Sequence, residues 1–377
     1  MRKAATQTPD RNFPHKTNIW NLARPFKRAY AAIFFLFIIS SCTTSSQPDE
    51  KDAAAVVKEG LSLPGTVTAQ KLTGGHSGSY LFLATDGTEK YVVRFMKKES
   101  QQKWQREIDN LKIAHENGYG PKIYFADPSK GICIMEYLDG KGKITYQDMQ
   151  QDRFYVALAQ LLQKIHRGKP FLDRKFYDPL QRIDYEIQKN KFKYNLYIPI
   201  ARIEQTLKEI REALLPYRKT APCHNDLHLR NIIFLENKCK AIDYEAAGPG
   251  DPFYDLAMVA AATSFYSRPS HEELLFESYL ERKPSTKEKA ILYLMKQVVF
   301  LKWTFDALDR ITPEGIREYE LIEVPPISEF AKDRLEGKLD LSVTENTLME
   351  LKLLLHEIFS HIESPQFAHA IELLNGD

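Results

Sequence analysis

His224-Asn-Asp-Leu-His-Leu-Arg-Asn231, with Ile242-Asp-Tyr-Glu245 behind it, is the part of this 377-residue sequence that decides the fold. Its polar side chains lie in a loop between apolar runs. Asp226 and Asn231 belong to that loop, and Asp243 follows two short predicted strands joined by a hairpin turn. Because a hairpin brings the outer ends of its strands together, we expect Asn231 and Asp243 to meet at one edge.

These oxygen-bearing side chains suit phosphoryl transfer. Mg²⁺ prefers oxygen ligands, usually one or two from the protein, with phosphate and water completing its octahedron. The Asn231 amide and the Asp243 carboxylate meet that need, and Asp226 can then accept the proton of an attacking hydroxyl. We therefore predict Asp226 as the base and Asn231 and Asp243 as metal ligands. The alternative is a chance polar loop whose carboxylate caps a turn.

The motif resembles the aminoglycoside phosphotransferase and choline kinase superfamily, whose signature is H-x-D-x-x-x-x-N followed by a strand ending in I-D-[FWY]. His224, Asp226, Asn231 and Asp243 all match. The resemblance implies a two-lobed, protein-kinase-like α+β fold, with a small β-rich lobe that has one helix and a larger, mainly helical lobe. It also implies ATP and Mg²⁺ as cofactors, with GTP not excluded.

A downstream segment, Gly250-Asp-Pro-Phe-Tyr-Asp-Leu-Ala257, looks like a helix start of the same superfamily. Asp251 is a good N-cap residue, and Pro252 suits the first helical position. By resemblance, the loop from His224 to Asn231 is the catalytic loop. Asp255 should brace its backbone, and His224 should have a structural role in it.

An upstream loop, from Leu72 to Tyr80, looks like the one that covers the nucleotide phosphates. Glycine lets the backbone approach a ligand closely, and backbone N–H groups with serine hydroxyls can hold anions. The predicted contacts in this loop are Gly74, Gly75, Ser77, Gly78 and Ser79.

Arg94 occupies the strand position where most kinases of this fold carry a lysine that holds the α- and β-phosphates. Arginine is forked and bulkier, so the geometry of this contact must differ. Glu107 is its predicted ion-pair partner and Glu99 is the rival; the alternative for Arg94 is an ordinary strand cation with a solvated head. By resemblance, Glu136 to Leu138 forms the hinge between the lobes and holds adenine through backbone groups.

Hydrophobic periodicity supports this architecture. Residues 80–84 and 91–96 predict a hairpin with a turn at Asp86-Gly87, and residues 101–116 predict a helix. Beyond residue 139 the pattern is mainly helical, with capping-box sequences that begin at Ser270 and Ser285.

The N-terminus indicates targeting. Residues 1–42 combine a basic region with the short apolar stretch Ala31–Ile39, and Ile39-Ser-Ser-Cys42 resembles a bacterial lipobox. We therefore predict a signal or membrane-targeting segment over 1–42 and a polar tether over 43–59, followed by lobes at 60–138 and 139–377. The alternative is an apolar stretch that is neither cleaved nor lipidated. Localisation stays open, because the lipobox favours a membrane-attached protein whereas ATP favours the cytoplasm.

Charge and cysteine content argue against a nucleic-acid-binding protein and against a zinc site. The first 42 residues carry seven cations and one anion, which leaves 45 cations and 49 anions in the remainder. A formal charge of −4 there gives no electrostatic case for nucleic-acid binding. The four cysteines form no C-x-x-C pair, so zinc is not expected, and Cys133 is predicted to be a small buried hydrophobic residue.

Fewer residues of the sequence indicate which molecule accepts the phosphoryl group. Ile242-Asp-Tyr-Glu-Ala-Ala-Gly248 looks more like choline and ethanolamine kinases, which enclose a cationic amine with aromatic and acidic groups. Glu245, Trp303, Phe305 and Asp306 are candidates for such a pocket, although Trp303 could simply pack its helix.

The sequence therefore predicts a kinase for a small-molecule hydroxyl, and the resemblance favours an amino alcohol such as choline or ethanolamine. His228 and Arg230 could contact phosphate or only hydrogen-bond the loop. The absence of D-F-G and A-P-E segments argues against a conventional protein kinase. The alternative from another class is an exported lipoprotein that uses a kinase-like fold as a non-catalytic binding module. Oligomeric state is left open.

Overall fold

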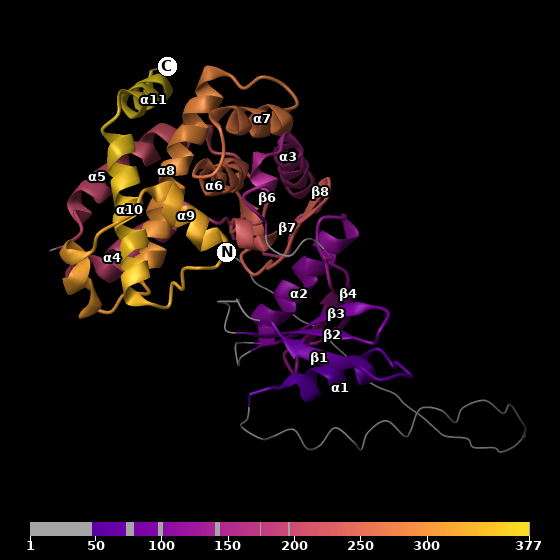
Figure 1. The fold of residues 1–377 in the computed structure, drawn as a ribbon. Coiled ribbons are helices and arrows are strands. Elements are labelled where there is room, and N and C mark those ends of the chain that lie inside the picture. Colours follow the sequence, from indigo (N-terminus) through magenta and orange to yellow (C-terminus); the bar gives the residue numbers. More distant parts are fainter. Residues whose placement is uncertain are drawn as a thin grey trace, which may run out of the picture. The chain divides into compact units, whose positions relative to one another are not determined.

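The computed structural model describes residues 47–72, 79–96, 101–139, 144–173, 175–194 and 197–376. Residues 48–377 form one compact unit. A five-stranded sheet with two helices comes first in this unit, and a mainly helical part follows it (Figure 1). We call them the first lobe (residues 48–138) and the second lobe (residues 139–376). The predicted α+β architecture is confirmed.

The first lobe contains five antiparallel strands in the order β1-β2-β3-β5-β4. Its elements are α1 (Glu50–Gly60), β1 (Thr68–Lys71), β2 (Tyr80–Thr85), β3 (Lys90–Phe95), α2 (Gln101–Glu116), β4 (Ile123–Asp127) and β5 (Ile132–Glu136). The predicted hairpin is β2 and β3, in which Leu81 lies opposite Arg94. Gly87 takes a φ of 96° in its turn, a conformation that glycine adopts without steric strain.

Each face of this sheet is covered by a helix. On one face, Val57 of α1 packs with Phe82 and Ile134. On the other, Trp104 and Ile108 of α2 pack with Cys133, which is fully buried as predicted. Alternate residues of a strand point to opposite faces, so the residues of β3 are divided between these two helices.

The predicted tether over residues 43–59 is wrong in its second half, because α1 begins at Glu50. Asp49 caps this helix by accepting hydrogen bonds from the backbone N–H groups of Lys51 and Asp52, at 2.8 and 2.9 Å. The apolar residues that follow it cover the sheet. The first lobe therefore has two helices where the sequence predicted one.

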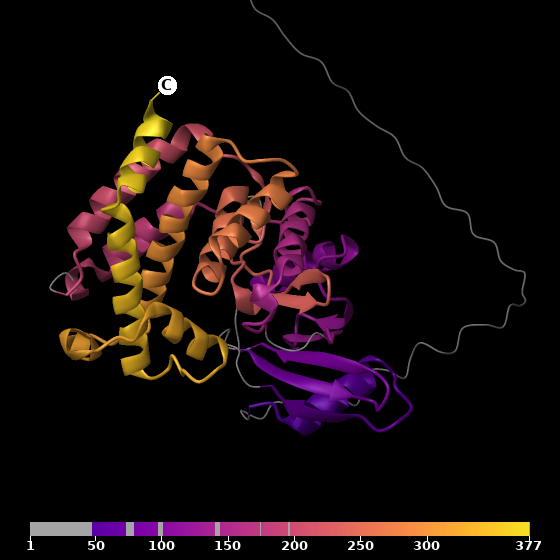
Figure 2. The same ribbon diagram turned by 45° about the horizontal axis from the view of Figure 1, so that its top comes forward.

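The second lobe is built mainly of helices that pack around α8. Its elements are α3 (Asp152–His166), α4 (Pro179–Tyr194), α5 (Ile200–Leu214), β6 (Ala221–Cys223), β7 (Ile232–Leu235), β8 (Lys238–Ala241), β9 (Gly248–Gly250), α6 (Pro252–Ser264), α7 (Pro269–Leu280), α8 (Thr286–Leu308), α9 (Ile327–Leu335), α10 (Thr344–Ile362) and α11 (Pro365–Asn375). Helix α8 contacts α4, α6, α10 and α11, and α10 runs beside it in both views (Figures 1 and 2).

Two predicted helix starts have different outcomes. Ser285 caps α8 as predicted: its hydroxyl accepts from the Glu288 N–H at 3.2 Å, and the Glu288 carboxylate accepts from the Ser285 N–H at 2.9 Å. The predicted cap at Ser270 is wrong, because α7 already begins at Pro269, a residue suited to the first helical position.

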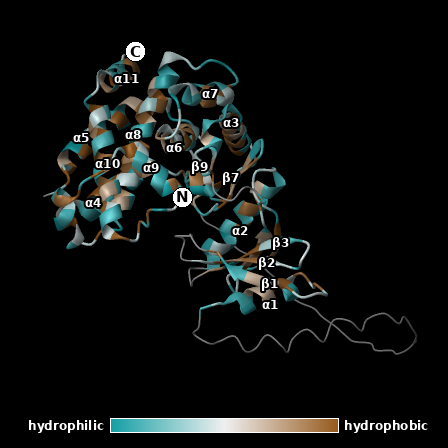
Figure 3. Cartoon of the chain, viewed as in Figure 1, coloured by the Kyte–Doolittle hydropathy of each residue, from teal (hydrophilic) through white to brown (hydrophobic). Residues whose placement is uncertain are grey.

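Helix α6 is buried on almost every side and buries eleven of its thirteen residues. The other helices of the second lobe show hydrophilic and hydrophobic sides (Figure 3). Among the described residues, we find no helix with the length and apolar character needed to cross a bilayer. The burial of α6 gives the second lobe a fixed element from which polar side chains can position a neighbouring loop.

Candidate active site

Arg94 lies on the sheet face that α2 covers, with only 7% of its surface exposed. Its guanidinium forms an ion pair with Glu107 of α2 and donates from Nε to Ser79 Oγ at 3.1 Å. It also lies 5.3 Å from the centre of the Trp104 ring. The predicted ion pair is therefore present, and the solvated alternative for Arg94 is wrong. The rival partner Glu99 lies outside the described residues.

Two carboxylates of the second lobe join this pair. Carboxylate oxygens of Glu107, Asp243 and Glu245 lie within 4.8 Å of one another. We call these three residues and Arg94 the Arg94 cluster. Burial raises the pKa of Glu107 to about 7, against the opposing effect of Arg94 and with help from the negative charge of Asp243. Converging carboxylate oxygens are suitable ligands for a hard cation such as Mg²⁺.

Asp243 has an uncommon backbone conformation and an unsatisfied oxygen. Its φ is 66°, which is unusual for a residue other than glycine. Its Oδ1 is buried and has no hydrogen-bond partner within the part of the chain that the structure describes. Leaving a buried acceptor unpaired costs about 1–3 kcal/mol, so the chemistry of this oxygen fits that of a cation ligand.

The hairpin of β7 and β8 brings Asn231 to the same edge as Asp243. Ile232 pairs with Ala241, and the N–H of Ile242 donates to the Asn231 carbonyl at 2.9 Å. Asn231 directly precedes Ile232, and Asp243 directly follows Ile242. Both predicted metal ligands therefore lie at this end of the hairpin, as expected from the sequence. The Asn231 amide nitrogen donates to the Asp226 carbonyl at 2.9 Å, which leaves its Oδ1 as the atom that can ligate a cation.

Asp255 of α6 is fully buried and holds the start of the catalytic loop. Its carboxylate accepts hydrogen bonds from the backbone N–H groups of His224 and Asn225 at 2.7 and 2.8 Å. His166 Nε2 lies 3.2 Å from the same carboxylate. The bracing contact expected for Asp255 is present. His224 Nε2 lies 3.0 Å from the Ile242 carbonyl and so links the loop to the hairpin.

A glycine allows this loop to fit against the neighbouring strand. Asn225 has a φ of 64° and donates from its amide to the Ala246 carbonyl at 3.0 Å. A Cβ atom at Gly250 would lie 2.2 Å from Asn225 Oδ1, well inside van der Waals contact. A side chain at residue 250 would therefore clash with Asn225, which explains why this position is a glycine. The sequence did not predict this steric requirement.

Asp226 is more accessible than the buried residues Asn225 and Leu227 on either side of it, with 30% of its side chain exposed. His228 Nε2 lies 3.8 Å from its carboxylate. Burial lowers the pKa of His228 to about 4, although the Asp226 charge opposes this effect. The neutral form of His228 is therefore favoured at pH 7.

Sequence reasoning did not single out Lys302 of α8, whose charge interacts with that of Asp226. Its Nζ donates to Asp306 Oδ2 at 2.7 Å, and 17% of its side chain is exposed. Burial acts to lower the pKa of Lys302, but the charges of Asp306 and Asp226 outweigh it and raise the pKa. Tyr177 lies within reach of the same charges. We call Tyr177, Asp226, Lys302 and Asp306 the Lys302 cluster.

The predicted acceptor pocket is not assembled as expected. Glu245 belongs to the Arg94 cluster, and Asp306 pairs with Lys302. Trp303 packs against Phe300 with ring centres 5.8 Å apart, and Phe305 is only 1% exposed. The alternative in which Trp303 packs its helix is thus supported. Lys302 could not have been singled out from the sequence, because a lysine on a helix is usually a solvated residue.

The nucleotide predictions are only partly within the described residues. Gly74, Gly75, Ser77 and Gly78 lie outside them. Glu136 ends β5, and its carboxylate accepts from Lys240 Nζ and from the Lys122 N–H, both at 3.0 Å. Leu138 follows the strand and is half-buried. Contacts of this hinge with adenine remain a prediction.

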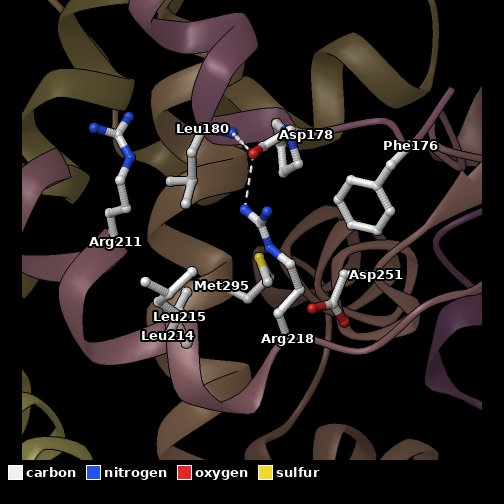
Figure 4. A pocket seen from close by; sticks show the side chains of 10 residues that line it. Phe176, Asp178, Leu180, Arg211, Leu214, Leu215, Arg218, Asp251 and Met295 are labelled. Atoms are coloured by element: carbon white, nitrogen blue, oxygen red, sulfur yellow. Dashed lines mark hydrogen bonds and ion pairs between the residues drawn. The ribbon is translucent and has the colours of Figure 1, made fainter. Parts of the chain in front are cut away.

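A pocket elsewhere in the second lobe contains none of the predicted site residues (Figure 4). Arg218 pairs there with Asp178 at 2.8 Å, and Asp178 accepts from the Leu180 N–H at 3.0 Å near the start of α4. These contacts satisfy the polar groups of the pocket and fix the helix start, so we assign it a structural role.

Comparison with known proteins identifies relatives. Protein LicA of Haemophilus influenzae is 21% identical over 194 residues, which are 49% of this chain and 56% of LicA. Ethanolamine kinase 2 of Rattus norvegicus is 27% identical over 163 residues, or 40% of this chain and 41% of that kinase. This chain thus spans only about half of each relative's length.

The fold is similar to a choline/ethanolamine kinase family protein from Mesorhizobium loti, with a TM-score of 0.65 and 16% identity over 87% of this chain and 99% of that one. The sequence profile of the phosphotransferase enzyme family (APH) matches residues 68–285, more than half of the chain. This range includes the Arg94 cluster and the catalytic loop. The chain belongs to the phosphotransferase enzyme family.

Proposed function

We propose that this protein transfers the γ-phosphoryl group of ATP to a hydroxyl group of a small molecule. The observation that carries this proposal is the common placement of Asp226, Asn231 and Asp243, which one loop and one hairpin hold in position. Asp255 anchors the start of that loop from α6. Phosphoryl transfer depends mainly on such positioning and on electrostatic stabilisation.

Asp226 would act on the acceptor. Its carboxylate accepts the hydroxyl proton while the acceptor oxygen forms a bond to the γ-phosphorus. The bond between that phosphorus and the β,γ-bridging oxygen breaks, and ADP leaves with the electron pair. Because the transition state is loose, Asp226 mainly orients the hydroxyl. Its partial exposure, 30% of the side chain, lets a small molecule approach.

Asn231 and Asp243 would hold Mg²⁺, and the unpaired Oδ1 of Asp243 fits this role. When bound, the ion neutralises charge on the phosphate oxygens. Arg94 would contact the α- and β-phosphates from the opposite lobe, held in place by its pair with Glu107. Its forked guanidinium can bind two phosphate oxygens at once.

The relatives favour an amino alcohol as the starting candidate for the acceptor. One is an ethanolamine kinase, and the Mesorhizobium structure belongs to a choline/ethanolamine kinase family protein. These names concern those proteins, so the acceptor must be tested directly. Choline and ethanolamine belong in the first acceptor panel.

The test is Mg²⁺-dependent release of ADP by the full chain over an acceptor panel, with Asp226→Asn as the variant. We expect the substitution to lower kcat by about 10²–10⁴-fold, the usual contribution of a positioned base, with an unchanged unfolding temperature. Asp333→Asn is the matched control, because Asp333 forms a surface ion pair with Lys338. If the Asp226→Asn variant and the wild type turned over equally fast, Asp226 would not be the base.

A second candidate function is a membrane-attached, non-catalytic binding module. The lipobox-like Ile39-Ser-Ser-Cys42 favours it. Mass spectrometry of the protein from its native membranes would decide. A lipid on Cys42 together with no affinity for Mg²⁺–ATP would support the binding module, whereas Mg²⁺–ATP binding would support the kinase.

A further inference from the structure

We propose that Asn110 is a positioning residue, which holds the turn after Asp243 and so fixes this predicted metal ligand relative to Arg94. Asn110 lies on α2 in the first lobe, whereas Asp243 belongs to the second lobe. The inference rests on the proposed function and adds to it a residue that lies outside the sequence motifs. It concerns how the predicted phosphate contact and the predicted metal site keep their separation.

Asn110 is fully buried, and both ends of its side-chain amide form hydrogen bonds. The amide nitrogen donates to the carbonyls of Tyr244 and Ala247, at 3.4 and 3.2 Å. The amide oxygen accepts from the Leu172 N–H at 3.0 Å. All three partners are backbone groups of the second lobe. A buried amide is costly unless such bonds are made, so Asn110 favours one position of α2 relative to these segments.

The two carbonyls belong to a turn that directly follows Asp243. The N–H of Ala247 donates to the Tyr244 carbonyl at 3.3 Å and closes this turn. Asp243 has a left-handed φ of 66°, which costs free energy in a residue other than glycine and persists only where the surrounding structure holds it. Asn110 contributes to this restraint, because it donates to both ends of the turn.

The chain before Asp243 is tied to the same part of the first lobe. Tyr119 follows α2, and its carbonyl accepts from the Ala241 N–H at 2.8 Å and from the Tyr244 hydroxyl at 3.2 Å. Contacts with α2 and the residues after it therefore flank Asp243 on both sides. The position of this predicted metal ligand is thus linked to the first lobe.

Helix α2 also carries the partner of Arg94. Glu107 pairs with Arg94 and lies three residues before Asn110. Residues three apart lie on the same side of a helix, with about 5–6 Å between their Cβ atoms. One helix therefore holds both the guanidinium predicted to contact phosphate and the turn that follows Asp243. Both groups must reach the phosphates of one Mg²⁺–ATP, so their separation affects its binding.

The rival is a purely structural role for Asn110. The two roles differ in their dependence on Asp243. If Asn110 only stabilises the fold, its loss should weaken ATP binding equally whether or not residue 243 keeps its carboxylate. If it positions Asp243, the loss should be large only in a chain that keeps this carboxylate. A double-mutant cycle measures such non-additive effects.

The experiment measures the Kd of the full chain for ATP by calorimetry, with excess Mg²⁺ and without an acceptor. We expect Asn110→Ala to raise this Kd by about 5- to 30-fold, a range typical of residues that act together. The cycle is completed in an Asp243→Asn background, because asparagine tolerates the left-handed conformation. There, Asn110→Ala should change the Kd by less than about 2-fold.

Two further variants make the result specific. Asn110→Ser keeps a donor on a shorter side chain, so it should give a smaller loss in the same direction. Asn190→Ala is the matched control, because Asn190 is also buried and donates to the Glu186 carbonyl at 3.0 Å within α4 and to Asp309 at 3.4 Å. It should leave the Kd for ATP unchanged. Unfolding with urea checks that each variant is folded.

The other outcomes each decide against the inference. Equal losses in the two backgrounds would overturn it and leave the proposed function intact. An unchanged Kd in Asn110→Ala would do the same. If neither variant of Asn110 folds, this residue is structural and the inference is rejected. If the wild type does not bind Mg²⁺–ATP, the proposed function fails, and the inference fails with it.

Discussion

The Arg94 cluster and the Lys302 cluster differ in the ratio of carboxylates to cations. In the Arg94 cluster, three carboxylates converge beside one guanidinium. In the Lys302 cluster, two carboxylates accompany one ammonium group, and Lys302 pairs with Asp306 at 2.7 Å. Carboxylates suit a metal ion, whereas cations suit an anionic group. The comparison teaches that the excess of carboxylates over cations, which a metal ion would balance, is greater in the Arg94 cluster.

The largest effect should come from breaking the ion pair of the Arg94 cluster. Arg94→Met leaves Glu107 as a buried carboxylate without its partner, and removing one member of a buried pair costs about 3–5 kcal/mol. We expect this loss in the free energy of unfolding, measured with urea. The double variant Arg94→Met/Glu107→Leu should recover part of it. No recovery would mean that packing, rather than charge, stabilises this cluster.

Asp255 braces the loop that carries Asp226 of the Lys302 cluster and the predicted metal ligand Asn231. In Asp255→Asn, one amide oxygen must replace a carboxylate that accepts from two backbone N–H groups. We expect a destabilisation of about 2 kcal/mol and a marked fall in kcat, as the loop loses its anchor. Urea unfolding and ADP release measure the two effects. Asp152→Asn, at an exposed residue, is the control, and an equal effect there would contradict the bracing role.

The Lys302 cluster depends on α8, whose start Glu288 stabilises. Hydrogen bonding to Arg282 lowers the pKa of Glu288 to about 2, and the Ser285 N–H contributes. We expect Glu288→Gln to lower the free energy of unfolding by about 1 kcal/mol at pH 7. The ionised carboxylate stabilises the folded state above its ordinary pKa of 4.5, and this contribution is lost as the pH falls towards 2. The difference from the wild type should therefore shrink over that range, and a constant difference would contradict the argument.

The smallest effect concerns His228. Its lowered pKa of about 4 implies that the imidazole stays neutral between pH 5.5 and 8, since burial opposes a further cation near Lys302 and Arg230. Imidazole resonances in NMR spectra, assigned with His228→Asn, should show no titration in this range. Below pH 6.5 the cost of keeping His228 neutral should begin to lower stability. A titration midpoint near the ordinary pKa of 6.5 would contradict the burial that the structure shows.

Several features were predictable because they depend on residues that are close in the chain. The β2–β3 hairpin follows from strand residues around Asp86-Gly87, and the Ser285 cap follows from a four-residue pattern. The Arg94–Glu107 pair needed the resemblance to a known fold. The tether prediction was wrong because the apolar residues of α1 gain stability only from the sheet that they cover.

The sequence by itself determined the residues on which the proposed reaction depends. The loop from His224 to Asn231 and the strand that leads to Asp243 are short enough for local geometry to place three oxygen-bearing side chains together. Only the tertiary structure decided which charges lie together. Lys302 and Glu350 come from separate helices, and electrostatic interaction depends on distances in space that chain separation does not give.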